Sequence, residues 1–261
     1  MDQTRLPPET LRAWWALGLV LAVLLWVMWN PGTNINAFFA INAWGAGTER
    51  FWAGITLLGD TAVTAVLLLP FVWRHPRVVW TAVLAGVVAT MLVHDLKPAL
   101  SVVRPAGVYP EGVVHVIGHA LHSNSFPSGH AASYFTIAGA LALALRLSLP
   151  GVLAVFALAA FGAISRSVVG AHWPQDILAG ALIGWLAAGM GWRLSRCFPV
   201  NRRWGQPLLA LILVGGLVAL VNFDGGYPEG RWVLILVALW AVFGSAWAML
   251  SGGSKNRHER V

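Results

Sequence analysis

Residues 78–105 read VVWTAVLAGVVATMLVHDLKPALSVVRP, an apolar run of membrane-spanning length that ends in a basic segment with two prolines. A bilayer core about 30 Å thick needs roughly 20 apolar residues per helical span. The whole 261-residue chain has the same character, because 58% of its residues are hydrophobic, 10% are charged and its mean hydropathy is +0.71. We therefore predict a single integral membrane domain over residues 1–261, with no separate soluble domain.

Apolar runs of similar length recur along the chain, separated by charges, proline or glycine. They predict an all-α, polytopic membrane helix bundle with a six-helix core over about residues 12–196 and two extra spans over about 207–250. The segment 34–44 is too polar to span and is either an interfacial helix or an external loop. The eight predicted spans are 12–29, 52–73, 78–96, 130–147, 150–168, 175–196, 207–223 and 231–250.

Basic residues are distributed unevenly between the two ends of these spans. An even number of spans places both termini on one side, and twelve of the seventeen Lys and Arg residues fall there. Because such residues are retained in the cytoplasm, we predict cytoplasmic termini. The net charge of +7 thus has a membrane explanation and does not indicate a nucleic-acid partner. The five basic residues on the opposite side are Arg50, Lys97, Arg104, Arg166 and Arg231.

Three polar clusters interrupt the apolar chain, and the eight-span arrangement puts all of them at the end opposite the termini. Lys97, Arg104 and Arg166 bring three cations into a low-dielectric surrounding, where their repulsion is costly unless an anion binds between them. A phosphate fits, since guanidinium groups bind its oxygens in pairs and an ammonium supplies a point charge. The clusters cover residues 97–105, 127–130 and 165–176.

The second and third clusters add an anion site and two imidazoles. Ser128 and Gly129 precede an apolar run, so their backbone N–H groups are expected at a helix N-terminus, where anions bind. His130 then lies in the first helical turn. His172 precedes a predicted helix, and Asp176 lies four residues on, where its carboxylate can fix the imidazole tautomer and leave Nε2 free for attack.

The remaining histidines have simpler explanations. His94 is predicted to be a packed interfacial residue outside the site. His115, His119 and His122 are spaced by four and three, which would align them for a metal if their loop were helical. Contacts to a headgroup or pH-sensitive contacts are the preferred interpretation, and no metal or other cofactor is predicted.

In their order and spacing these clusters resemble the signature of the type 2 phosphatidic acid phosphatase superfamily, which also includes acid phosphatases and vanadium haloperoxidases. The signature is Lys, six residues, Arg-Pro; then Pro-Ser-Gly-His; then Ser-Arg, five residues, His, three residues, Asp. The chain reads KPALSVVRP at 97–105, PSGH at 127–130 and SRSVVGAHWPQD at 165–176, so all eleven specified positions agree. The resemblance covers the six-helix core and gives no role to the last two spans.

The resemblance implies a metal-independent hydrolase. His172 would attack phosphorus to form a phosphohistidine, Asp176 would orient it, and His130 would protonate the leaving oxygen. Charge neutralisation and positioning by protein groups are the main requirements of phosphoryl transfer. The groups implied to hold the phosphoryl oxygens are Lys97, Arg104, Ser128, Gly129 and Arg166.

A site at a membrane interface among apolar helices suits a phosphate carried on a lipid. We predict a bacterial inner-membrane lipid phosphatase with a periplasmic site and a substrate in the outer leaflet, of the undecaprenyl diphosphate or phosphatidylglycerol phosphate type. Lipid A phosphatase activity and phosphotransfer to a second lipid are the alternatives. A transporter or flippase fits less well, because transport sites lie near the bilayer midplane. No oligomeric state is predicted.

Overall fold

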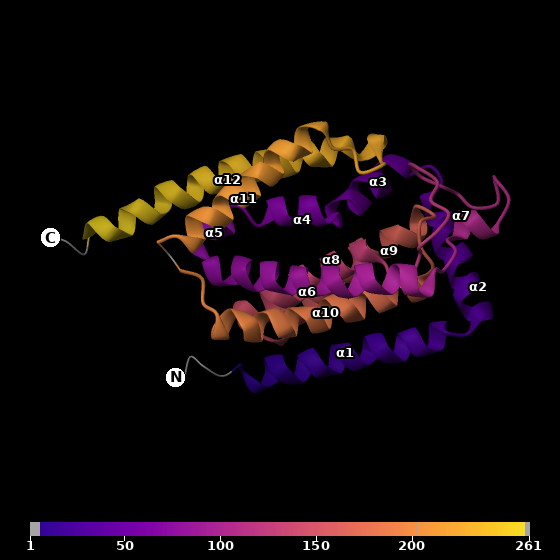
Figure 1. Ribbon diagram of the computed structural model, residues 1–261, viewed down its shortest axis with the longest axis horizontal. Helices are drawn as coiled ribbons and strands as arrows, with labels where there is room; N and C mark the ends of the chain where they lie inside the picture. The colour runs from indigo at the N-terminus through magenta and orange to yellow at the C-terminus, as the bar shows by residue number, and fades with distance from the viewer. Residues whose placement is uncertain (1–5, 202, 259–261) are drawn as a thin grey trace.

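The chain forms a bundle of long helices that run along one common direction (Figure 1). The computed structural model describes residues 6–201 and 203–258, and within these residues the regular structure is helical throughout. The start of α1 and the end of α12 lie at the same end of the bundle (Figure 1). The longest helices are α1 (Pro8–Met28), α6 (Pro76–Leu100), α8 (Gly129–Ala144), α9 (Leu149–Val168), α10 (Pro174–Cys197), α11 (Gly205–Ala219) and α12 (Arg231–His258).

The predicted second span, residues 52–73, is broken into three helices. They are α3 (Glu49–Leu58), α4 (Thr61–Leu67) and α5 (Phe71–Arg74). The first break occurs because Asp60 caps α4, accepting a hydrogen bond from the Ala62 N–H at 2.8 Å. The second occurs at Pro70, which has no N–H to continue a helix. Over the described residues, six helices are long and apolar enough to cross a membrane, fewer than the eight predicted spans, and α8 has 16 residues.

Helix α10 forms the centre of the bundle and packs against α8, α6 and α1. Its contact with α8 depends on two glycines. A Cβ atom at Gly180 would collide with the carbonyl oxygen of Ser128, and one at Gly184 would collide with that of Ala132. Small residues four positions apart allow membrane helices to approach this closely. The result is that the start of α8 is fixed against the start of α10.

The C-terminal pair, α11 and α12, packs on the broken second span. The Gln206 side chain of α11 donates a 2.8 Å hydrogen bond to the Val72 carbonyl of α5, and Trp232 of α12 covers Gly54 of α3. The short helices η2 (Leu220–Asn222) and η3 (Pro228–Gly230) connect the pair. The outward faces carry large exposed apolar side chains, as expected for an integral membrane protein. Examples are Leu211, Val218, Ile235 and Leu250.

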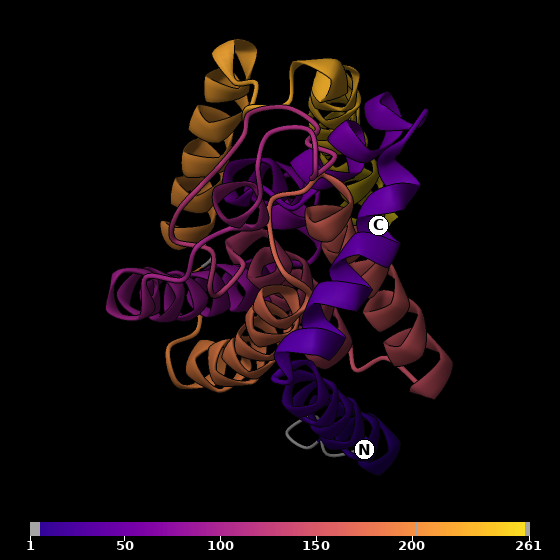
Figure 2. The same ribbon diagram turned by 90° about the vertical axis from the view of Figure 1, so that its right-hand side faces the viewer.

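The end of the bundle opposite the start of α1 is covered by α2 (Pro31–Asn42), η1 (Ala43–Gly45), α7 (Pro105–Val108) and the loop over residues 109–127 (Figure 2). Of the two alternatives for residues 34–44, the structure shows a helix over most of the segment, because α2 extends to Asn42. The Asn42 side chain donates to the carbonyls of His115, Ser167 and Val168 at 2.8, 3.2 and 3.0 Å. This one amide ties α2 to the covering loop and to the end of α9.

Candidate active site

The residues predicted for the site are brought together at the end that α2 covers. The second cluster meets the third directly, because the Ser128 N–H donates to the Asp176 carbonyl at 2.9 Å. The other members lie at neighbouring helix ends: Lys97 in the last turn of α6, Arg104 just before α7, Gly129 and His130 at the start of α8, Arg166 in the last turn of α9, and His172 just before α10.

Arg104 connects the first cluster to the third. Its Nη1 lies 3.1 Å from His172 Nε2 and donates to the Ala171 carbonyl at 2.9 Å. Its Nε donates to the Ser123 carbonyl at 2.7 Å. Its Nη2 and the Lys97 ammonium donate to one shared acceptor, the Asn124 carbonyl, at 3.2 and 2.9 Å. Arg104 of the first cluster therefore lies beside the His172 imidazole of the third cluster, and Lys97 lies next to Arg104.

The hydrogen bonds around His172 define its tautomer. Guanidinium nitrogens can only donate, so the Nε2 that faces Arg104 carries a lone pair and the ring proton is on Nδ1. Nδ1 lies 3.5 Å from Asp176 Oδ2 and 3.4 Å from Ser125 Oγ. The Asp176 oxygen also accepts hydrogen bonds from Ser125 Oγ and from the Trp173 N–H. Asp176 thus lies close to the His172 ring, and Ser125 is hydrogen-bonded to its carboxylate.

His172 is almost completely buried, with 2% of its surface exposed. Burial lowers the pKa of His172 well below its usual value, and the charges of Arg104, Arg166 and Lys97 lower it further. The ring is therefore neutral at pH 7 and keeps the lone pair that a nucleophile needs. His130 comes two residues after Ser128, whose N–H is bonded to the Asp176 carbonyl, so the start of α8 brings this second imidazole to the same end of the bundle as His172.

The start of α8 differs in one respect from the sequence prediction. The Ser128 N–H was expected to face an anion, but it is bonded to the Asp176 carbonyl, and the Ser128 hydroxyl caps α8 by accepting from the Ala131 N–H at 3.4 Å. Ser128 is fully buried. The close packing of α8 on α10 accounts for this difference. Gly129 and His130 provide the first two N–H groups of the helix, which precede its internal hydrogen bonding.

Arg166 enters the site from α9 and is 2% exposed. Its Nη1 donates to the Thr56 hydroxyl at 2.6 Å and to the Tyr227 hydroxyl at 2.8 Å. Among the described residues, its Nε is buried without a hydrogen-bond partner. The guanidinium is thus held along one edge by two hydroxyl groups.

Three site residues were missed in the sequence. Ser125 lies in the covering loop two residues before Pro127, Thr56 lies inside an apolar run, and Tyr227 belongs to the connection between the last two helices. The pair Gly225-Gly226, with φ of 59° and 81°, is a signal for a tight turn just before Tyr227. Nothing in the sequence around Thr56 distinguishes it from other span residues.

The loop histidines contact the neighbouring groups through their backbone, and the His122 carbonyl accepts a hydrogen bond from the Arg104 N–H at 3.0 Å. Their segment is not helical, so the alignment that a metal site required does not form. His115 Nε2 lies 3.5 Å from Glu49 Oε1, and the His119 N–H donates to the Gly226 carbonyl at 3.0 Å. In the part of the chain that the structure describes, no three His, Cys, Asp or Glu residues form a metal-binding group.

The fold and the site together define an integral membrane helix bundle in which three cationic side chains and two histidines gather at helix ends on one side of the bundle. A family model of the PAP2 superfamily matches residues 77–198. The chain is also 32% identical over 161 residues to the bacitracin transport permease protein BcrC of Bacillus licheniformis, and this alignment covers 77% of that protein and 59% of the chain. The chain belongs to the PAP2 superfamily.

Similar proteins include two lipid A 1-phosphatases. The chain is 32% identical over 149 residues to that of Rhizobium johnstonii and 33% identical over 150 residues to that of Rhizobium etli. The alignments cover 57% and 60% of those proteins and 56% of this chain, so the match spans less than two thirds of their length. The crystal structure of Aquifex aeolicus LpxE superposes with a TM-score of 0.54 at 29% identity, covering 62% of this chain and 95% of LpxE.

Proposed function

We propose that this protein is a membrane lipid phosphatase that works through a phosphohistidine at His172 and needs no metal. The observation that carries the proposal is the position of His172 Nε2, a neutral, buried nitrogen 3.1 Å from the Arg104 guanidinium, with its ring proton directed to Ser125 and Asp176. A phosphoryl group bound to Arg104 is then adjacent to the lone pair that attacks it.

The proposed reaction has two steps. In the first, a bond forms between His172 Nε2 and phosphorus, the bond to the lipid oxygen breaks, and His130 gives its proton to that oxygen. In the second, water attacks phosphorus, His130 takes up the water proton, and the bond to Nε2 breaks to release inorganic phosphate. Lys97, Arg104 and Arg166 balance the charge of the phosphoryl oxygens throughout.

An apolar cavity of about 390 Å³ favours a lipid substrate. It lies between α4, α6 and α8, and its lining reaches from Leu68 and Met91 to Gly129 and Ser133 at the start of α8. Gly129 is adjacent to His130, so an acyl or isoprenoid chain in this cavity has its phosphate at the site. His94, which was predicted to be a packed interfacial residue outside the site, also lines the cavity.

The substrate headgroup is a separate part of the proposal. Undecaprenyl diphosphate and phosphatidylglycerol phosphate are the substrates predicted from the sequence. The 1-phosphate of lipid A is a second candidate, because the two similar Rhizobium proteins are lipid A 1-phosphatases. We also propose that the site faces the periplasm of a bacterial inner membrane, which gives it access to outer-leaflet lipids.

The experiment that tests this proposal measures phosphate release by the purified protein in EDTA from these three lipids. We expect release from at least one lipid and a loss of roughly a thousandfold or more in His172→Ala. His75→Ala, at the opposite end of α6, is the matched control and should keep full activity.

Two outcomes would contradict the proposal. If His172→Ala keeps its activity, the nucleophile is wrong, and if zinc must be added back after EDTA, the metal-independent mechanism is wrong. Transfer of labelled phosphate to a second lipid, with no free phosphate, would establish phosphotransfer instead of hydrolysis.

A further inference from the structure

One edge of the Arg166 guanidinium is hydrogen-bonded to protein side chains, and the other edge is available to a ligand. Nη1 carries two N–H groups, and both are used, by the hydroxyls of Thr56 and Tyr227 at 2.6 and 2.8 Å. The Tyr227 ring also lies 5.5 Å from the guanidinium carbon. The buried Nε has no protein partner within the described residues. The Nε and Nη2 edge is therefore the one that two phosphate oxygens can bind side by side.

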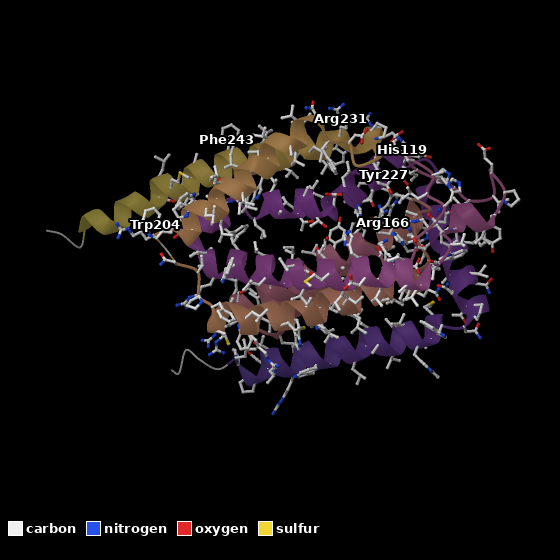
Figure 3. All side chains as sticks on the ribbon, viewed as in Figure 1. His119, Arg166, Trp204, Tyr227, Arg231 and Phe243 are labelled. Atoms are coloured by element: carbon white, nitrogen blue, oxygen red, sulfur yellow. The ribbon has the colours of Figure 1, made fainter. Side chains whose placement is uncertain are left out.

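The two hydroxyls come from outside the segment that matches the family. The PAP2 match covers residues 77–198, whereas Thr56 lies in α3 and Tyr227 lies between α11 and α12. Both are buried, with 0% and 4% of their surface exposed. Figure 3 shows Tyr227 between His119 of the covering loop and Arg166 of α9. The last two helices thus place a side chain against a core residue of the site.

The position of Tyr227 is fixed by backbone contacts. The His119 N–H donates to the Gly226 carbonyl at 3.0 Å, and the Tyr227 N–H donates to the Asp224 carbonyl at 2.9 Å. Gly118 has a φ of 75°, and a Cβ atom there would lie 2.7 Å from Tyr227 Cδ1. On the other side, a Cβ atom at Gly230 would lie 2.6 Å from the backbone of α3. The segment 224–230 is therefore wedged between the covering loop and α3.

We propose that Tyr227, together with Thr56, is a positioning residue that turns the Nε and Nη2 edge of Arg166 toward the substrate phosphate, so that the α11–α12 pair completes the active site. The proposal rests on the proposed function, because it takes the anion at Arg166 to be the substrate phosphate. It gives the last two spans a role in the active site, and the residue that carries this role lies outside the segment 77–198 that matches the family.

The test compares Tyr227→Phe with wild type. The substitution keeps the ring and removes the acceptor, so one N–H of a charged group loses its partner. We expect kcat/KM to fall about tenfold, together with weaker inhibition by inorganic phosphate. Tyr109→Phe makes the same chemical change in the covering loop, where the ring contacts Phe39 and Trp173, and should match wild type.

A double-mutant cycle with Arg166→Lys separates positioning from a general structural role. Lysine has no Nη1 edge, so Tyr227→Phe should have little further effect in that background. Thr56→Val and Thr56→Ser form a second pair, in which only the valine variant should lose affinity for inorganic phosphate.

The outcomes distinguish the two proposals. If the wild-type protein releases no phosphate from any lipid, the proposed function fails. If the wild-type protein is active and Tyr227→Phe equals it, or if Tyr227→Phe has the same effect in both backgrounds, the positioning role of Tyr227 is wrong.

Discussion

Arg104 is oriented by the protein before any anion is bound. Three backbone carbonyls, those of Ala171, Ser123 and Asn124, accept its hydrogen bonds at 2.9, 2.7 and 3.2 Å, while Nη1 also faces His172. A cation held in this way needs little reorganisation when negative charge develops beside it. The same carbonyls partly neutralise a buried charge that would otherwise be costly. The residue therefore serves both folding and the proposed chemistry.

His172 makes stability dependent on pH in a predictable direction. Its pKa in the folded protein is lowered, so between that pKa and about 6.5 the unfolded chain binds a proton that the folded protein does not. The free energy of unfolding should therefore fall as the pH drops below about 6.5, by up to about 1.4 kcal/mol per pH unit from this group. Denaturation in detergent at pH 7.5 and 5.5 measures the change.

The matched variant for this measurement is His172→Gln, which cannot titrate. It should lose about 1 kcal/mol less stability than wild type over the same interval, because the other histidines contribute to both proteins alike. Equal losses in the two proteins would show that His172 is not the group responsible.

At the residue scale, the sequence identified the members of the site that lie in compact motifs. Lys97, Arg104 and Asp176 are recognisable because their spacing is fixed within short stretches. Ser125 and Tyr227 are not, since each reaches the site through a loop whose path depends on tertiary contacts such as the bond between His119 and Gly226. Long-range pairing of this kind leaves no periodic pattern in a sequence.

Among the elements, the junction of α8 and α10 determines the geometry of the site. The Ser128 N–H to Asp176 carbonyl bond lies where Gly180 allows the two helices to touch. The sequence predicted both helices but not this contact, because a glycine in an apolar helix has several explanations. The breaks in the second span were not predicted, because the segment 52–73 is apolar enough to indicate one continuous helix. Asp60, a capping residue, and Pro70, which has no N–H, mark the two breaks.

Gly180→Ala tests the importance of this junction. The added methyl group collides with the Ser128 carbonyl and must push α8 and α10 apart, so we expect a loss of about 1–3 kcal/mol in stability and a lower kcat. Gly215→Ala on α11 is the control, because nothing lies within 4 Å of its Cβ position and stability should stay the same or rise. Equal effects of Gly180→Ala and Gly215→Ala would contradict the importance of the α8–α10 junction.

Across the whole molecule, the site and the helix ends near the termini lie at opposite ends of the bundle (Figure 1). Cys197, the single cysteine of the chain, is exposed at the end of α10, opposite the site. If the termini are cytoplasmic as predicted, we expect this thiol to face the cytoplasm. The orientation can therefore be measured with the native residue.

We expect a membrane-impermeant maleimide to label Cys197 in inverted membrane vesicles and not in intact spheroplasts. Glu111→Cys in a Cys197→Ser background places the thiol in the exposed covering loop and should give the reverse pattern. Labelling of both positions from the same side would reject the proposed topology.

The wedging of residues 224–230 between the covering loop and α3 has a consequence for protein engineering. A chimera that joined residues 1–198 to the tail of a relative without these two helices would retain every motif residue and Thr56, yet it would lose the Tyr227 hydroxyl that accepts from Arg166 Nη1. Grafting the α11–α12 hairpin as one piece, from Gly205 to the end of α12, would carry its tyrosine along. Segments exchanged between homologues should therefore keep α11, α12 and their connection together.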